Sequence, residues 1–308
     1  MRERVALENP RMEIRLDTSR VRPLLCARML PRSQTVIAPG WEMPLRERRL
    51  DTVEGVYQLN SGDVIKRTGS VEVRRVQLGA GADGGAVFIK KYWIGKPSQL
   101  WSGMFRGTLF GQSKARREYE NLARLRAWQL DAPAPVAYGE ERRAGWLVRS
   151  FLISESVSDP TSLQSFIRDR LATLPPEESP RVRRQLIAGL ADCTRRLHEH
   201  GFVHHDYFWR NILLSDGDLT RFFLIDAHKG RRWRPGEEWR CRAKDLGALD
   251  APASRFFRRT ERLRFFLRYR QHRRLDHEDK ALLRLAFKLA EPMREVQLRR
   301  VLGLGRPA

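Results

Sequence analysis

Residues 201–214 read GFVHHDYFWRNILL. Within this stretch Asp206 is followed, after four residues, by Asn211 and then by a short apolar run. A second apolar run, Phe222–Ile225, ends directly before Asp226. Two short buried strands in succession favour a hairpin. We therefore expect two carboxylates and one amide to meet at one place in the fold.

Two more charged residues of interest lie upstream. An apolar strand ends in Lys90, and Glu118 lies on a helix that the apolar spacing predicts from Ser113 onward. Successive residues of a strand point to opposite faces, so the residues alone leave both Lys90 and Lys91 open. Glu120 competes with Glu118, which is preferred because it lies beside the apolar stripe of the helix.

These five side chains are the groups that a magnesium-bound nucleoside triphosphate requires. An ammonium at Lys90 can neutralise the α- and β-phosphates, and Glu118 can hold that ammonium in place. Mg²⁺ is a hard cation that prefers oxygen ligands, which Asp226 and Asn211 supply. Asp206 can accept the proton of an attacking hydroxyl. The order Lys, Glu, Asp, Asn, Asp matches a protein-kinase-like phosphoryl transferase.

The secondary-structure signals change along the chain from strand to helix. Strands are expected within Asp63–Trp93 and at Trp146–Ile153. A long helix is expected over Val182–Leu197, where apolar residues recur near every fourth position, and the segment 255–303 is mostly helical. The N-terminal third is thus rich in strands and the C-terminal half is rich in helices.

This pattern predicts an α+β, two-lobed protein-kinase-like fold. Residues 1–44 are expected to be an irregular extension. Residues 45–150 would form a small N-lobe with an antiparallel sheet and one helix, and residues 151–308 a larger helical C-lobe. The hinge would lie near Arg149–Ser158, and a cleft between unlike lobes is where a ligand would sit.

The composition points to an anionic partner. The 308 residues include 59 Lys and Arg against 37 Asp and Glu, a formal charge of +22. Such a balance favours association with a nucleotide, a nucleic acid or a membrane surface that carries phosphates. A genome-wide bias toward arginine would give the same count.

The cysteines and the apolar runs bear on location. Cys26, Cys193 and Cys241 are odd in number and far apart, which gives no disulfide framework and favours a reducing cytoplasm. The first residues lack the apolar stretch of a signal peptide, and no run approaches the roughly 20 apolar residues of a membrane span. We expect a cytoplasmic protein, with peripheral contact at the inner face of the cytoplasmic membrane left open.

Several segments resemble the lipopolysaccharide kinase family, also called the Kdo/WaaP or InaA-like family of the protein-kinase-like superfamily. The resemblance covers roughly residues 60–300. The matching segments are SKARREY at 113–119, followed by PAP at 133–135, then residues 201–214, FLIDAH at 223–228, and KDL at 244–246.

The resemblance implies transfer of the γ-phosphate of ATP, with Mg²⁺, to a sugar hydroxyl in the inner core of lipopolysaccharide at the cytoplasmic face of the inner membrane. It implies that Asp206 is the base and that Asn211 and Asp226 are the Mg²⁺ ligands. It also implies that Lys90 binds phosphates and that Glu118 is its partner. The expected acceptor is an anionic glycolipid or a sugar.

Departures from protein kinases point away from protein substrates. His205 precedes the base where protein kinases usually carry Arg, and Phe208 stands where Ser/Thr kinases place a lysine. Asp226 is followed by Ala227-His228 and not by Phe-Gly. The segment from Asp226 to Asp245 is too short for a long activation loop with a peptide-docking platform. A small molecule or a glycan is the expected acceptor.

Further segments are candidates for ligand contacts. Gly69 lies in the only candidate for a phosphate-binding turn, where backbone amides could cap phosphates. The arginines of 231–242 could hold an anionic acceptor, and the aromatic loop 93–111 could meet lipid, although packing against the lobe is favoured there. The histidines of 198–205 lack a zinc spacing, so a helix end entering a catalytic loop is favoured. Residues 255–270 indicate an amphipathic helix.

Two other functions remain open on sequence alone. A soluble small-molecule kinase, like the aminoglycoside or choline kinases, would share Asp206, Asn211 and Asp226. A non-catalytic binder, either a pseudokinase or a basic module, is the third class. Intact catalytic residue types argue against the pseudokinase, and we expect no nucleic-acid partner.

Overall fold

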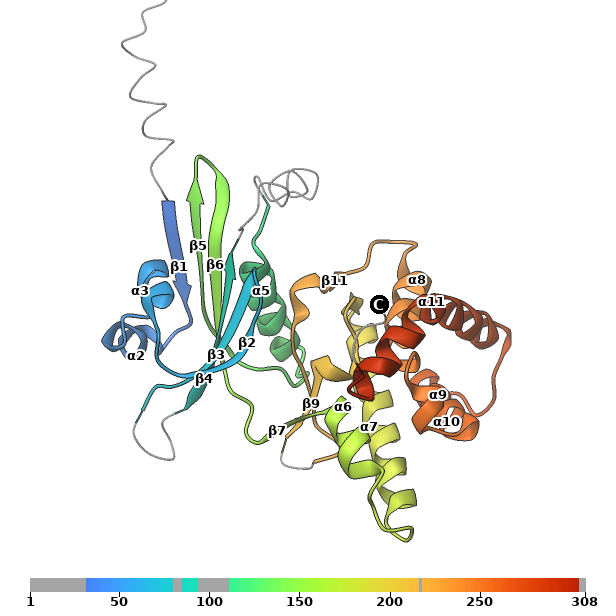
Figure 1. The fold of residues 1–308 in the computed structure, drawn as a ribbon. Helices are drawn as coiled ribbons and strands as arrows, with labels where there is room; N and C mark the ends of the chain where they lie inside the picture. Colours follow the sequence, from blue (N-terminus) through green and yellow to red (C-terminus); the bar gives the residue numbers. More distant parts are fainter. Residues whose placement is uncertain (1–31, 80–84, 94–110, 216–217, 305–308) are drawn as a thin grey trace, which may run out of the picture.

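The computed structural model describes residues 32–79, 85–93, 111–215 and 218–304. It has an α+β architecture in which a sheet-rich N-lobe and a helical C-lobe lie side by side, as expected (Figure 1). The N-lobe carries a six-stranded antiparallel sheet with the order β1-β5-β6-β4-β3-β2. Its strands are β1 (Arg32–Ile37), β2 (Asp63–Arg67), β3 (Val71–Gln77), β4 (Ala86–Trp93), β5 (Pro135–Arg143) and β6 (Trp146–Glu155).

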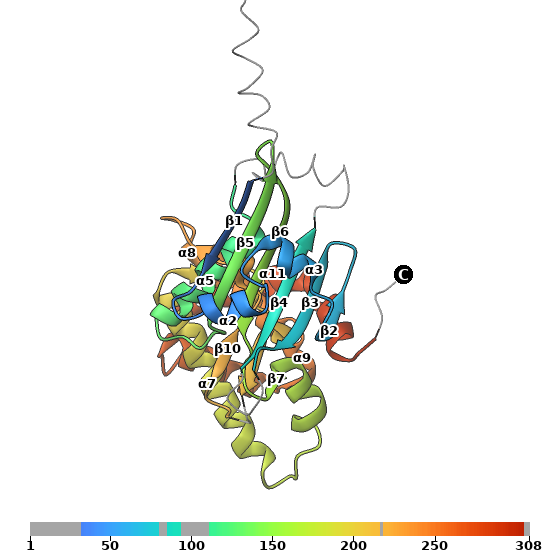
Figure 2. The same cartoon turned by 90° about the vertical axis from the view of Figure 1, so that its left-hand side faces the viewer.

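Helices cover both faces of this sheet. The helix α5 (Lys114–Ala127) begins at Ser113, whose hydroxyl accepts from the Arg116 amide as an N-cap. The short helices α2 (Glu42–Glu47) and α3 (Val53–Gln58) pack on the opposite face, in front of the strands in Figure 2. They are additions to the one helix that the sequence predicts for this lobe.

The strand β4 has one buried face and one half-buried face, and its two lysines lie on different faces. Val87 and Ile89 pack against the core under α2 and α3. Because side chains alternate along a strand, Lys91 points to that same side, whereas Lys90 and Tyr92 point toward α5.

The C-lobe is built around the long helix α7 (Ser179–Glu199), whose apolar stripe lies in the main core. Asn211 leads into a small three-stranded sheet, and the helices α8 and α11 pack against each other at the far side. The remaining elements are β7 (Pro160–Ser162), α6 (Leu163–Ser165), η1 (Phe166–Leu171), β8 (Phe202–Val203), η2 (Trp209–Asn211), β9 (Ile212–Ser215), β10 (Phe222–Leu224), η3 (Ala227–Lys229), β11 (Arg231–Arg232), α8 (Glu238–Asp250), α9 (Ala253–Phe256), α10 (Arg259–Arg270) and α11 (His277–Val301).

The prediction of irregular chain up to residue 44 is wrong for its last part. Arg32–Ile37 forms the edge strand β1, which pairs with β5, and α2 already begins at Glu42. An edge strand buries little, so its half-exposed pattern gives a weak period-two signal. Residues 1–31 lie outside the described part of the chain.

Two further details differ from the expectation. The strand β5 is an addition to the strands expected from the sequence, and it begins at Pro135. In α10 the expected apolar stripe is incomplete, since Phe266 is buried but Leu263 is exposed. In the ranges that the structure describes, no helix combines the length and the apolar content that a membrane span needs.

Gly247 allows α8 and α11 to approach closely. A Cβ added there would lie 2.7 Å from the backbone oxygen of Ala286, which cannot move without shifting α11. We predict that Gly247→Ala lowers stability by about 1–3 kcal/mol through overpacking, although Ala is favoured over Gly by roughly 1 kcal/mol in an open helix. Thermal unfolding, monitored by circular dichroism, shows whether the substitution lowers or raises the stability.

Gly85→Ala is the matched control, because a Cβ at that position would meet nothing within 4 Å and its φ is not positive. An unchanged or raised melting temperature for Gly247→Ala would show that α8 and α11 do not depend on this contact.

Candidate active site

A cleft of about 670 Å³ separates the two lobes. Strands of the N-lobe sheet form one wall, and the loop that follows β10 forms part of the other. Of the predicted site residues, Lys90, Glu118, Asn211 and Asp226 all line it. Its volume falls within the range of small-molecule sites.

Lys90 and Glu118 form a buried ion pair at the back of the cleft. Lys90 Nζ lies 2.5 Å from Glu118 Oε1, and the Tyr92 hydroxyl donates to Glu118 Oε2 at 3.0 Å. Glu118 is 1% exposed. Burial by itself would lower the pKa of Lys90, but the charges of Glu118 and Asp226 outweigh it and raise that pKa. The ammonium is therefore held charged and in a defined position.

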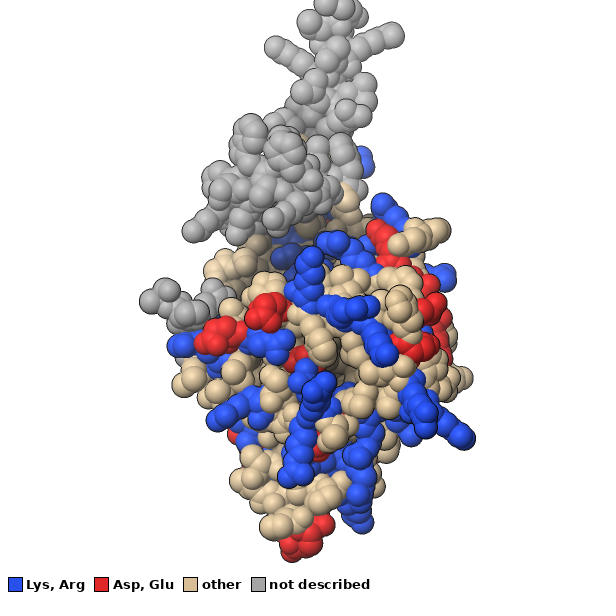
Figure 3. Space-filling model, turned by 90° about the vertical axis from the view of Figure 1, so that its right-hand side faces the viewer, with Lys and Arg blue, Asp and Glu red and all other residues tan. Residues whose placement is uncertain are grey.

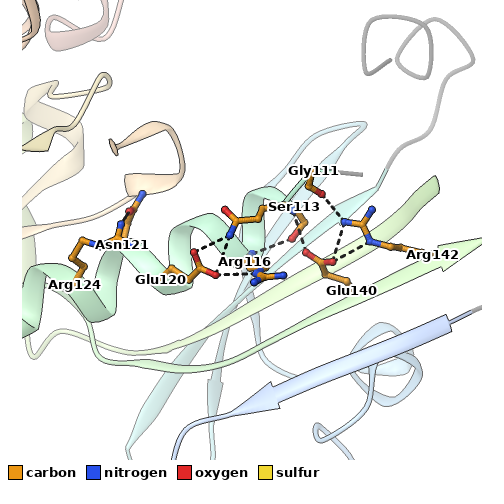
Figure 4. A network of polar contacts seen from close by, with 9 residues as sticks. Gly111, Ser113, Arg116, Glu120, Asn121, Arg124, Glu140 and Arg142 are labelled. Atoms are coloured by element: carbon orange, nitrogen blue, oxygen red, sulfur yellow. Dashed lines mark hydrogen bonds and ion pairs between the residues drawn. The ribbon is translucent and has the colours of Figure 1, made fainter. Parts of the chain in front are cut away.

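The two alternatives that the sequence left open have other partners. Lys91 Nζ donates to the Leu59 carbonyl at 3.0 Å and lies 3.5 Å from Glu72, on the far face of the sheet. Glu120 accepts from Arg116 and Gln112 at the exposed side of α5, where Figure 4 shows it turned toward Arg116. Neither residue approaches the cleft.

Asp206 lies on a loop that buried hydrogen bonds hold in shape. Asp245 is fully buried in α8 and accepts from the backbone amides of His204 at 2.7 Å and of His205 at 3.0 Å. His205 has a φ of 66°, an unusual conformation for a residue with a side chain. Asn211 Nδ2 donates to the Asp206 carbonyl at 2.9 Å. These hydrogen bonds therefore fix the conformation of the backbone that carries the Asp206 carboxylate.

Asp226 ends the β10 hairpin in a left-handed conformation, with a φ of 59°. Its Oδ1 atom lies 3.0 Å from His228 Nδ1 and 3.7 Å from Lys90 Nζ. Burial would raise the pKa of Asp226, but the His228 hydrogen bond and the Lys90 charge hold the pKa well below its ordinary value. The carboxylate is therefore ionised at neutral pH.

The turn that follows Asp226 is fastened to the N-lobe helix. Asn121 lies one turn after Glu118 on α5, and its Nδ2 donates to the carbonyls of Ala227 and Gly230, each at 2.8 Å. Arg124 in turn donates to Asn121 Oδ1 at 2.7 Å, and Figure 4 shows these two side chains beside that turn. One helix therefore positions both the partner of Lys90 and the turn that carries Asp226.

Lys229 is a contact of Asp206 that sequence reasoning missed. Its Nζ lies 2.8 Å from Asp206 Oδ2, and the lysine side chain is 56% exposed. The only available signal was its place three residues after Asp226. Asn121 was also missed, because a lone asparagine on a helix predicts no particular partner.

The histidines of 198–205 have structural roles. His204 Nε2 donates to the Ile225 carbonyl at 3.1 Å, which links the Asp206 loop to the strand before Asp226. His198 lies against Asp245 and Tyr269, and His200 stacks on Trp128. These contacts agree with the interpretation of a helix end that enters a catalytic loop.

Gly69 lies in the turn between β2 and β3. A Cβ there would meet nothing within 4 Å, so no close packing requires a glycine at this position. The neighbouring Thr68 lines the cleft and accepts from the Val71 amide. The turn thus reaches the cleft, and a phosphate role for Gly69 stays a prediction. Of the predicted aromatic loop, residues 94–110 lie outside the described part of the chain.

The donor set at Asp226 fits a magnesium ion. Asn211 uses its Nδ2 atom on the Asp206 carbonyl, which leaves its Oδ1 available as a hard ligand beside the Asp226 carboxylate. Glu118, Asp226 and His228 also offer ligand atoms within 4.8 Å of one another. Both oxygens of Glu118 already bind Lys90 and Tyr92, so Asp226 and Asn211 are the better pair.

The pattern of the lipopolysaccharide kinase (Kdo/WaaP) family matches residues 64–269. The lipopolysaccharide core heptose(I) kinase WaaP of Pseudomonas aeruginosa is 29% identical over 189 residues, 59% of this chain and 69% of that protein. WaaP of Escherichia coli is 33% identical over 141 residues, 44% of this chain and 51% of that protein.

A solved structure of WaaP in complex with acyl carrier protein has the same fold. It aligns with a TM-score of 0.59 at 25% identity and covers 84% of this chain and 99% of that chain. The family match spans Lys90, Asn211 and Asp226, which line the cleft, and the loop that carries Asp206 directly before Asn211. The chain therefore belongs to the lipopolysaccharide kinase (Kdo/WaaP) family, a family of phosphotransferases with a kinase-like fold.

Proposed function

We propose that this protein transfers the γ-phosphoryl group of ATP, with Mg²⁺, to a sugar hydroxyl of a lipopolysaccharide core. The observation that carries the proposal is the meeting of Lys90, Glu118 and Asp226 in one cleft, with Asp206 on the adjoining loop. Membership of the family supports a lipopolysaccharide acceptor.

The N-lobe side of the cleft suits the nucleotide. Lys90 is the cation for the α- and β-phosphates, and Glu118 keeps it from turning away. Lys66 and Lys114 also line this side and add positive charge for the phosphates. Asp226 and Asn211 would hold Mg²⁺, which supplies charge neutralisation at the phosphates when it is bound.

Asp206 acts on the acceptor. The acceptor hydroxyl oxygen forms a bond to the γ-phosphorus while the bond from that phosphorus to the β–γ bridging oxygen breaks, and ADP leaves with that electron pair. The hydroxyl proton passes to the Asp206 carboxylate. Since the transition state is loose, orientation of the hydroxyl counts for more than basicity. Lys229 holds the carboxylate from the solvent side.

The basic surface suits work at a membrane that carries anionic lipids. Figure 3 shows the face with α8, α10 and α11, where Lys and Arg side chains are spread over the middle and acidic ones lie mostly toward the edges. Near an anionic bilayer each such charge contributes about 1 kcal/mol of attraction. We infer peripheral contact with the inner face of the cytoplasmic membrane, where the glycolipid acceptor would be met.

The proposed base is tested with Asp206→Asn, which keeps the size of the side chain and removes its proton-accepting charge. We predict a loss of phosphoryl transfer on the order of 10²–10⁴-fold with an unchanged melting temperature. The measurement is transfer of label from γ-labelled ATP to purified lipopolysaccharide cores, lipid precursors and free sugars. Activity near that of the wild-type protein would refute the role of Asp206, and rapid turnover of a soluble alcohol would favour a small-molecule kinase.

The two neighbouring lysines of β4 give a matched test of the nucleotide site. We predict that Lys90→Met raises the KM for ATP and lowers kcat, since an uncompensated Glu118 would then face the phosphates. Lys91→Met should lower stability, because Glu72 loses a buried partner, but should keep phosphoryl transfer. Steady-state kinetics at varied ATP compare the two variants. Equal losses of activity would argue that Lys90 acts only through the fold.

A further inference from the structure

Arg210 is a cation placed beside the candidate catalytic residues and held by uncharged groups. It directly precedes Asn211 on η2 and lines the cleft. Its Nη1 donates to Gln297 Oε1 of α11 at 3.0 Å, and its guanidinium carbon lies 4.4 Å from the centre of the Phe208 ring. Gln297 is 7% exposed, so this hydrogen bond is protected from water. The guanidinium is therefore held in one orientation.

A second arginine lies close to Arg210. Arg300 follows Gln297 by one helical turn on α11, so the two share a face of that helix. Gln164 of α6 donates to the Arg300 carbonyl at 3.3 Å, which holds this end of α11 against the C-lobe. Burial and the charge of Arg300 lower the pKa of Arg210, and the charges of Asp206 and Asp226 oppose that shift in part.

Neither of these two cations forms an ion pair with Asp or Glu within the described ranges of the chain. The carboxylates of Asp206 and Asp226 attract the charge of Arg210 without pairing with it. Two like charges that are partly removed from water repel each other, and a bound anion would relieve that repulsion. Arginine also matches the planar or tetrahedral oxygens of carboxylates and phosphates with two parallel hydrogen bonds. The pair has the chemistry of an anion site.

The position of the pair favours the acceptor over the nucleotide. Lys90, on the N-lobe, and Asp226 already serve the nucleotide phosphates in the proposed function. Arg210 and Arg300 both belong to the C-lobe, on the loop that carries Asp206 and on the helix packed against it. In an in-line transfer the acceptor hydroxyl, which Asp206 orients, approaches the γ-phosphorus from the side opposite the departing ADP.

The arginines that the sequence singled out for the acceptor are less suited to it. Arg231 lies 2.7 Å from Glu237, and Arg242 lies 2.8 Å from Glu238, so the cluster 231–242 neutralises part of its own charge. An arginine that already has a carboxylate partner gains less from a new anion than one that has none.

We propose that Arg210 and Arg300 form an acceptor subsite, which binds a carboxylate or phosphate group carried by the glycan next to the accepting hydroxyl. The subsite rests on the proposed function, because it names the acceptor of that same site. It makes this protein selective for acidic glycans over neutral ones.

Arg300→Gln tests the subsite without touching the Asp206 loop. We expect the KM for a lipopolysaccharide core oligosaccharide to rise about 10-fold, the effect of losing one charge-assisted hydrogen bond, while the KM for ATP stays unchanged. Arg299→Gln is the matched control, because it removes the same charge from the preceding residue of α11, which is paired with Glu295. A rise in the KM for ATP in place of that for the acceptor, or an equal effect of both variants, would overturn the subsite.

Modified acceptors identify the anion. Core oligosaccharide stripped of phosphate and core oligosaccharide with reduced carboxyl groups are compared on the wild-type protein and on Arg300→Gln. The acceptor that lacks the recognised group should bind the wild-type protein about 10-fold more weakly and should be insensitive to the substitution. If both modified acceptors behave like the intact one, the subsite is wrong.

Calorimetric binding of the oligosaccharide without ATP separates this inference from the proposed function. Binding that weakens in Arg300→Gln, in a protein that transfers no phosphate, would overturn the proposed function and keep the subsite. If the protein transfers phosphate but the wild-type protein and Arg300→Gln bind the oligosaccharide equally well, the proposed function is kept and the subsite is overturned.

Discussion

The buried contact of Lys90 with Glu118 is the interaction on which the rest of the site depends. An ammonium and a carboxylate removed from water are stable only as a pair, and removing one partner of such a pair costs about 3–5 kcal/mol. The third charge, Asp226, comes from the other lobe and lies 3.7 Å from the ammonium. Contacts between β4, α5 and the turn after β10 therefore position the three charged side chains of the cleft.

Backbone hydrogen bonds from buried side chains support these charges. Asn121 fastens the turn after Asp226 to α5, and Asp245 fastens the loop before Asp206 to α8. Both Asp226 and His205 adopt positive φ angles, a conformation that costs free energy and that the surrounding contacts must maintain. Such rigidity suits a reaction whose barrier is lowered mainly by positioning.

Charge is distributed differently on the two sides of the cleft. On the N-lobe side Lys90 has the acidic partner Glu118, whereas Arg210 on the C-lobe side is held by an amide and an aromatic ring. A cation that is paired with a carboxylate is held in position at the nucleotide site. Cations without such partners are available to an anion that arrives with the acceptor.

The sequence alone determined the residue types, their order, and the alternation from strands to helices, because these depend on local periodicity and spacing. It predicted β4, α5, α7 and the β9–β10 hairpin, and it named Lys90, Glu118, Asp206, Asn211 and Asp226 as candidates. It could not choose Lys90 over Lys91 from the residues alone, since the two lysines lie on opposite faces of β4 and only the helices packed on each face distinguish them. It missed β1, Asn121, Lys229 and the nearness of Arg210 to α11, because these depend on contacts between residues far apart in the chain, which only the tertiary structure decides.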